Sequence, residues 1–150
     1  GSGLSEAFTL YLEPGYHGFV GEKASDYITA AGQITVNFGT QIENAVGSDY
    51  SDVIHGSNSS NDIFGGAGND TFYLEAGPVT KYMLIPDYVD GEDALVIEYD
   101  NSAPAPVVTI VEANGHSLIH LDDVRVADIR DAAGTLEVGD ISLVGVDRSA

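Results

Sequence analysis

The feature that most constrains this chain is a nine-residue repeat over residues 47–73. Each of its three units opens with glycine, has Asp or Asn sixth and a large apolar residue eighth. Glycine stands at Gly47, Gly56 and Gly65, the sixth positions are Asp52, Asn61 and Asp70, and the eighth are Ile54, Ile63 and Phe72. This alternation of small polar and short apolar segments predicts turns and strands in regular succession.

Each unit has the composition of a tight turn followed by a short strand. Glycine adopts backbone angles that other residues avoid, so the first six residues can direct several carbonyl oxygens toward one point. The last three residues then extend, and the eighth side chain points into a core. Two units complete one coil, so turns on the same edge are expected about 18 residues apart.

This geometry predicts a cation site between turns 47–52 and 65–70, with Asp52 and Asp70 sharing one ion. Carboxylate and carbonyl oxygens suit Ca²⁺, which takes about six to eight oxygen ligands. On the other edge a weaker second site is expected between Glu43 and Asn61. The residues expected to hold the first ion are Gly47, Asp49, Ser51, Asp52, Gly65, Ala67, Asn69 and Asp70.

The charge of the chain points in the same direction. Five Lys and Arg against 24 Asp and Glu give a net charge of −19. A compact body with this charge repels itself unless cations neutralise the carboxylates, although an ordinary acidic surface is the alternative. Nucleic acids and anionic membranes need clusters of Lys and Arg, so neither is expected as a partner. Without cysteine, disulfides and thiolate ligands are excluded.

The rest of the chain indicates an all-β fold. Asn114-Gly115 predicts a hairpin turn, residues 101–106 with two prolines predict an exposed loop, and residues 126–130 are the best candidate for a short helix. Alternating apolar runs typical of strands occupy residues 8–12, 33–38, 107–111 and 117–121.

Several motifs carry a family resemblance. Residues 41–47, with Ile42-Glu43-Asn44-Ala45 leading into the repeats, resemble the C-terminal β-roll domain of serralysin-type metalloproteases, an RTX calcium-binding domain. The unit at 65–73 matches the RTX nonapeptide G-G-x-G-x-D-x-U-x in full. Residues 85–95 are similar to the element that closes many RTX domains, and 139–144 to the tail of type I secreted proteins. The likeness is specific over residues 41–73 and looser from residue 78 onward.

The resemblance implies a right-handed parallel β-roll with a β-rich C-terminal cap. Residues 1–77 are expected to form the strands and the roll, and 78–150 the cap with a secretion signal, in one module. It also implies secretion of the unfolded chain by a type I machine into the extracellular medium, where calcium binding drives folding. Such a module is a non-catalytic part of a larger bacterial protein, with a parent enzyme domain on its N-terminal side.

Asp87, Asp90 and Asp93 form a separate acidic group near the expected junction of roll and cap. Asp87 and Asp93 are candidate ligands for an additional calcium ion, because carboxylates spaced this closely converge readily in a turn. A solvated acidic turn around Gly91 is the alternative.

Other constellations do not indicate an enzyme. His116 and His120 lack the Glu of the HExxH zinc motif, since Ser117 stands in its place; a strand with both histidines on one face is expected. The alternative function is a calcium-dependent carbohydrate-binding or adhesion module that takes a polysaccharide. Exposed tyrosines can stack on sugar rings, although tyrosines in strands also cover cores; the candidates are Tyr11, Tyr16, Tyr27 and Tyr50.

Overall fold

The computed structural model describes residues 6–23, 33–76, 82–130, 132 and 134–148. Within these ranges every regular element is a β-strand except the short 3-10 helix η1 (Val138–Asp140), which confirms the all-β fold. The strands are β1 (Phe8–Tyr11), β2 (His17–Val20), β3 (Gln33–Thr35), β4 (Asn44–Val46), β5 (Val53–His55), β6 (Asn61–Phe64), β7 (Thr71–Glu75), β8 (Met83–Ile85), β9 (Ala94–Asp100), β10 (Val108–Ala113), β11 (His116–Leu121), β12 (Val124–Arg130) and β13 (Ile141–Val146).

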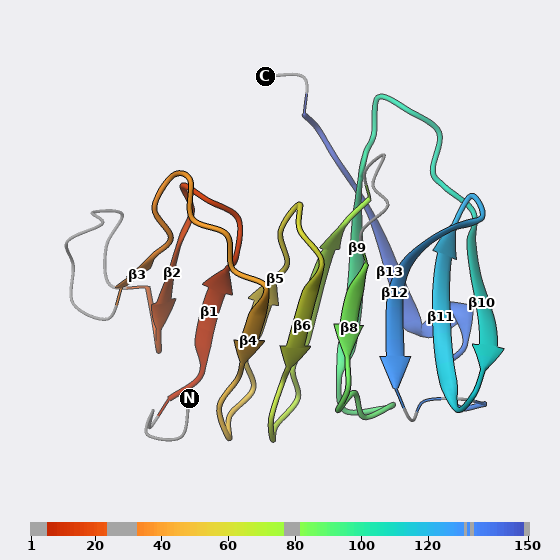
Figure 1. Ribbon diagram of the computed structural model, residues 1–150, viewed down its shortest axis with the longest axis horizontal. Coiled ribbons are helices and arrows are strands. Elements are labelled where there is room, and N and C mark those ends of the chain that lie inside the picture. Colours follow the sequence, from red (N-terminus) through yellow and green to blue (C-terminus); the bar gives the residue numbers. More distant parts are fainter. Residues whose placement is uncertain (1–5, 24–32, 77–81, 131, 133, 149–150) are drawn as a thin grey trace.

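The strands form two sheets, and the chain alternates between them from β4 to β9 (Figure 1). One sheet has the order β13-β9-β7-β5-β1-β2-β3 and the other β10-β11-β12-β8-β6-β4. β5 pairs in parallel with β7, and β4 with β6. Val53 lies opposite Thr71 and Asn44 opposite Asp62, a separation of 18 residues in each pair, as a coil of two nine-residue units requires.

Antiparallel strands extend both ends of this parallel roll. β2 and β3 continue the first sheet beyond β1, and β11 and β10 continue the second beyond β12. β8 and β9 pair in parallel with β6 and β7, so the roll runs past residue 77 as far as Asp100. The division of the module into 1–77 and 78–150 stays a prediction.

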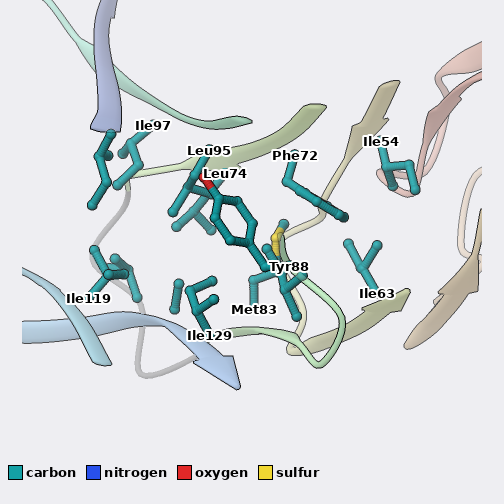
Figure 2. Close-up of a cluster of buried hydrophobic side chains, with 14 of the residues drawn as sticks. Ile54, Ile63, Phe72, Leu74, Met83, Tyr88, Leu95, Ile97, Ile119 and Ile129 are labelled. Atoms are coloured by element: carbon teal, nitrogen blue, oxygen red, sulfur yellow. The ribbon is translucent and has the colours of Figure 1, made fainter. Parts of the chain in front are cut away.

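The core lies between the two sheets, and the eighth positions of the repeat contribute to it (Figure 2). Ile54, Ile63 and Phe72 are each 0% exposed. Leu95 and Ile129 continue the same cluster beyond the repeats. The expectation that the eighth side chain of each unit points inward is therefore confirmed.

The region after the roll confirms two sequence expectations and corrects one. Asn114 and Gly115 connect β10 to β11 with φ values of 53° and 85°, the positive angles of a tight hairpin turn. Residues 101–106 form a loop without strands. The helix expected over residues 126–130 is wrong, because this segment belongs to β12. Its backbone pairs with β11 on one side and β8 on the other, and these tertiary pairings outweigh local preference.

Candidate metal centre

Three turns stack along one edge of the roll, at the lower end in Figure 1: residues 47–52, 65–70 and 87–93. The backbone of turn 65–70 lies directly against that of turn 47–52. Ala67 N–H donates to the Ser48 carbonyl at 3.2 Å, and Asn69 N–H donates to Ser51 Oγ at 3.0 Å. Gly66 has a φ of +103°, and a Cβ there would lie 2.0 Å from the Ser48 carbonyl oxygen. Glycine is therefore required for this approach.

The aspartates of these turns form a hydrogen-bonded ladder across the strands. Phe8 N–H donates to Asp52 Oδ1 at 2.8 Å, Asp52 N–H to Asp70 Oδ1 at 2.8 Å, and Asp70 N–H to Asp93 Oδ1 at 2.9 Å. Each carboxylate thus accepts the backbone N–H at the start of the neighbouring strand in the preceding coil. The ladder fixes one oxygen of every carboxylate and leaves the second available for a different partner.

The second carboxylate oxygen of each aspartate has different hydrogen-bond partners in the three turns. Asp52 Oδ2 accepts both Ser48 N–H, at 2.6 Å, and Ser48 Oγ–H, at 2.8 Å. Asp93 Oδ2 accepts Val89 N–H at 2.8 Å. Asp70 Oδ2 is buried and has no hydrogen-bond partner. Buried polar atoms normally have partners, and an ionised one without them is costly.

The pKa of Asp70 also shows that its carboxylate is poorly compensated. Burial raises the pKa of Asp70 to about 6, against the lowering effect of the hydrogen bond from Asp52 N–H. The charges of Asp93, Asp52 and Asp87 also raise this pKa. Burial likewise raises the pKa of Asp93, with further contributions from Asp87 and Glu92. The protein alone therefore disfavours the ionised form of Asp70, and a cation at this point would favour it.

The acidic group at residues 87–93 reaches turn 65–70, as the candidate extra site requires. Asp87 accepts Gly65 N–H at 3.1 Å and Gly66 N–H at 3.0 Å. Asp93 lies against Asp70 through the ladder, whereas Asp90 is exposed. Of the three aspartates, Asp87 and Asp93 are thus placed beside the repeat.

The opposite edge of the roll is organised differently. Asn61 Oδ1 accepts Ser57 N–H at 2.9 Å, and Asn61 Nδ2 donates to the Ile42 carbonyl at 2.8 Å. The side-chain amide of Asn61 thus bonds directly to the neighbouring turn. An aspartate side chain at this position has no N–H donor and would need a cation to bridge to the same carbonyl oxygen. Glu43 has an exposed side chain. The Glu43–Asn61 ion site stays a prediction, and this geometry does not favour it.

The remaining predicted ligands belong to the two stacked turns. Gly47 is buried and its N–H donates to the Phe64 carbonyl at 2.7 Å, whereas Asp49 is exposed. Ser51 accepts Asn69 N–H through its hydroxyl. Sequence reasoning missed Ser48, which caps Asp52. The signal was a serine at the second position of its unit, where the repeat prefers glycine.

The oxygen chemistry of the site fits calcium. Among the described residues, no three His, Cys, Asp or Glu side chains converge closely enough to hold a metal ion by themselves. An ion beside Asp70 therefore needs backbone carbonyl oxygens from the stacked turns as its other ligands. Such hard, carbonyl-rich ligand sets suit Ca²⁺ and not softer transition metals.

Stacked glycine-rich turns with buried carboxylates on a parallel β-roll define the class of cation-binding repeat domains. Residues 43–78 match the family model of the RTX calcium-binding nonapeptide repeat, described in four copies. No curated protein matches the chain. Residues 43–78 are therefore RTX calcium-binding repeats, and such repeats bind calcium and are not themselves catalytic. RTX repeats are typical of secreted proteins. In the described ranges no helix has the length and apolar character to span a bilayer.

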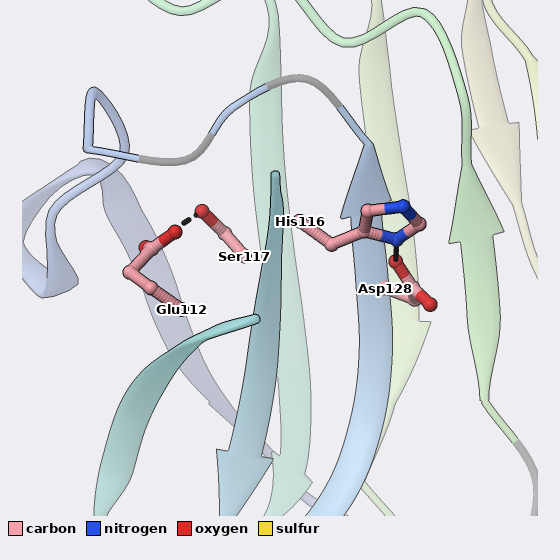
Figure 3. A network of polar contacts seen from close by, with 4 residues as sticks. All are labelled: Glu112, His116, Ser117 and Asp128. Atoms are coloured by element: carbon pink, nitrogen blue, oxygen red, sulfur yellow. Dashed lines mark hydrogen bonds and ion pairs between the residues drawn. The ribbon is translucent and has the colours of Figure 1, made fainter. Parts of the chain in front are cut away.

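A second polar cluster lies on the C-terminal sheet (Figure 3). His116 Nδ1 lies 2.7 Å from Asp128 Oδ1, and Ser117 Oγ–H donates to Glu112 Oε1 at 2.8 Å. His116 and Ser117 point to opposite sides of β11 (Figure 3), so serine, histidine and aspartate do not form a catalytic triad here. His116, Leu118 and His120 alternate along β11 with buried residues, which confirms that both histidines share one face.

Proposed function

We propose that this module is a calcium-triggered folding device of a larger secreted bacterial protein. The observation that carries the proposal is Asp70, which is 1% exposed and has one carboxylate oxygen without a hydrogen-bond partner. Asp52, Asp87 and Asp93 belong to the same stack of turns, and their charges raise the pKa of Asp70. Without a cation this arrangement opposes compaction, and with calcium it favours compaction.

The residues of this chain have distinct roles in that switch. Asp70 contributes the charged oxygen, with Asp87 and Asp93 on one side of it and Asp52 on the other. The glycines of turn 65–70 allow the backbones to approach so closely that carbonyl oxygens can complete the ligand shell. Bound calcium supplies the positive charge that offsets the mutual repulsion of these carboxylates.

The size of the effect is sufficient for a switch. Extracellular calcium modules commonly have a Kd of about 10⁻⁴ M. Roughly millimolar calcium then adds on the order of 1–2 kcal/mol per site. Domains are stable by only about 5–15 kcal/mol, and the net charge of −19 makes this one more dependent than most on neutralisation.

Secretion through a type I machine completes the proposal. RTX repeats are typical of secreted proteins. The calcium-poor cytosol would leave this acidic chain less stably folded until export. Residues 139–144 resemble the tail of type I secreted proteins. Fusion of a reporter to this chain, expressed with a type I exporter, tests this part; secretion should be lost when the tail after residue 138 is removed.

A calcium titration followed by far-UV circular dichroism tests the folding switch. The wild-type strand signal should grow with calcium. Asp70→Asn should start with more strand signal in chelator, because its buried charge is gone, and should gain less from added calcium. Asp62→Asn is the matched control, because Asp62 is exposed on β6 and lies outside the stacked turns. A wild-type spectrum that is the same in chelator and in roughly 10 mM calcium, about 100 times the assumed Kd, would reject the proposal.

Carbohydrate binding is the second candidate function, because Tyr11 and Tyr16 line a cavity on the roll. Tyr50 belongs to turn 47–52, and Tyr27 lies outside the described residues. The cavity, and not exposed tyrosines in general, is therefore the place where a sugar would bind.

A further inference from the structure

A cavity of about 270 Å³ lies beside the edge of the roll opposite the stacked aspartate turns. Its aromatic wall comes from the ends of β1 and β5 and the middle of β7, and Gly56 at the start of turn 56–61 contributes to the lining. Ligand-binding pockets for drug-sized molecules have about 300–1,000 Å³. This volume therefore suits one or two small rings.

Four aromatic rings stack in a row to form that wall. His55 stacks on Tyr11 with ring centroids 4.1 Å apart, and on Tyr73 with centroids 4.2 Å apart. Tyr16 continues the row, 5.7 Å from Tyr11. The stack follows from the parallel register, in which Tyr11 lies opposite His55 and His55 opposite Tyr73. The inner rings cover each other's faces, so ring edges, hydroxyl groups and nitrogens are what this wall offers a ligand.

His55 has hydrogen-bonding capacity that the described residues do not use. Neither of its ring nitrogens has a hydrogen-bond partner in the described ranges, and the same holds for the hydroxyl groups of Tyr11 and Tyr73. Burial lowers the pKa of His55 to about 4, so its ring is neutral at physiological pH. A neutral imidazole has one N–H donor and one acceptor nitrogen, which together match a hydroxyl group.

The rest of the lining sets the charge of the ligand. Glu13, Glu75 and Glu98 contribute carboxylates, and Arg148 forms an ion pair with Glu75. The one arginine is thus already neutralised, and the chain as a whole carries a charge of −19. An anionic ligand would be repelled here, whereas an uncharged polyhydroxyl ligand would not.

We propose, as a sharper form of the second candidate function above, on which it rests, that this cavity binds a neutral saccharide. His55 would form a hydrogen bond with a sugar hydroxyl, and the edges of the tyrosine rings would contact the C–H groups of the sugar. Aromatic side chains combine apolar surface with a polar group, and sugars have the same combination. The site is separate from the calcium turns and requires only that the domain is folded. It gives the module a recognition role in addition to a folding role.

The test is a titration of calcium-saturated, isotope-labelled protein with neutral tetrasaccharides built from glucose, mannose or N-acetylglucosamine, observed by NMR. At least one of them should shift the His55 ring and Tyr73 resonances while leaving turn 65–70 unchanged. An acidic tetrasaccharide of uronate units should shift neither. If no neutral tetrasaccharide shifts these resonances at roughly 10 mM, or if the uronate probe binds at His55 more tightly, the proposal is wrong.

A matched pair of variants separates binding from structure. His55→Phe keeps a ring in the stack and removes both nitrogens, so it should bind the sugar about tenfold or more weakly with an unchanged folded spectrum. His120→Phe, on the other sheet, should bind as the wild type does. Equal affinity in His55→Phe would overturn the assignment. Because folding is read from the free protein's spectrum, failure of sugar binding and failure of the calcium switch are distinguishable.

Discussion

Ser48 and Gly66 occupy the same position in turns one coil apart, yet only Ser48 caps the carboxylate of its own turn. Ser48 donates its N–H and its hydroxyl to Asp52, whereas Gly66 N–H donates to Asp87. Asp70, which ends the turn of Gly66, keeps a buried oxygen without a partner. The hydroxyl of Ser48, together with the hydrogen bond of Gly66 N–H to Asp87, thus leaves the uncompensated charge in turn 65–70, beside Asp87 and Asp93.

Asp70→Asn should stabilise the calcium-free protein. The substitution removes a buried charge that neighbouring carboxylates repel and introduces an N–H donor in its place. We expect a gain of about 1–2 kcal/mol in the free energy of unfolding, measured by urea denaturation in chelator at neutral pH. In millimolar calcium the wild type should be the more stable protein, because the variant lacks the carboxylate that is the main calcium ligand. A variant less stable than the wild type in chelator would contradict this account of Asp70.

Asn61→Asp, on the opposite edge of the roll, should destabilise the calcium-free protein. The Asn61 Nδ2 donor to the Ile42 carbonyl would become a carboxylate oxygen that faces another acceptor. We expect a loss of about 1–3 kcal/mol in chelator by thermal or urea unfolding, and a smaller loss in calcium. Equal stability of variant and wild type in chelator would show that this amide does not join the turns.

Gly66→Ala should disrupt the stacking of the turns. The new Cβ would meet the Ser48 carbonyl oxygen at 2.0 Å and would also require a positive φ. Gly39→Ala is the control, because Gly39 also has a positive φ but has nothing within 4 Å of its Cβ position. The control should lose about 1 kcal/mol, and Gly66→Ala several times more by urea unfolding in calcium. Similar losses of stability in both variants would mean that the positive φ alone requires glycine at position 66, and not the close approach of the two turns.

Acidification should reduce the difference between Asp70→Asn and the wild type in chelator. The pKa of Asp70 in the folded state is about 6, above the 3.8 of an unperturbed aspartate, so the folded state binds more protons between these pH values. Its protonated form therefore stabilises the wild type at low pH, and this contribution is lost as pH rises through about 6. His55, with a pKa lowered to about 4, acts in the opposite direction. Comparison of the two proteins cancels that effect.

The measurement is urea unfolding of both proteins at several pH values between neutrality and pH 5. The advantage of Asp70→Asn should shrink steadily across this range. Calcium affinity of the wild type should fall over the same range, because the ion competes with a proton. An advantage of Asp70→Asn that stays constant with pH would mean that Asp70 is ionised throughout.

The repeat itself allowed much of this structure to be predicted. The period of nine gives the 18-residue coil, the inward row of Ile54, Ile63 and Phe72, and the contact between turns 47–52 and 65–70. These features depend on local turn and strand chemistry. The position of Asp93 does not, because it follows Asp70 by 23 residues and lies outside the period.

Tertiary pairing explains what the sequence did not reveal. Residues 126–130 have a pattern compatible with a helix, but two neighbouring strands pair with them. The aromatic stack of Tyr11, His55 and Tyr73 requires knowledge that β1 lies beside β5, although 44 residues separate Phe8 from Asp52 in the sequence. Such long-range register is set by packing of the whole core and not by any single segment.

Anomalous X-ray diffraction from a crystal grown in calcium tests the central claim most directly. We expect an anomalous peak for an ion bound to Asp70 Oδ2, with this oxygen and carbonyl oxygens of the stacked turns at the roughly 2.3–2.6 Å typical of calcium ligands. Crystals of Asp70→Asn grown in the same solution should lack the peak. A well-ordered wild-type turn 65–70 without a peak beside Asp70, in ample calcium, would contradict the account.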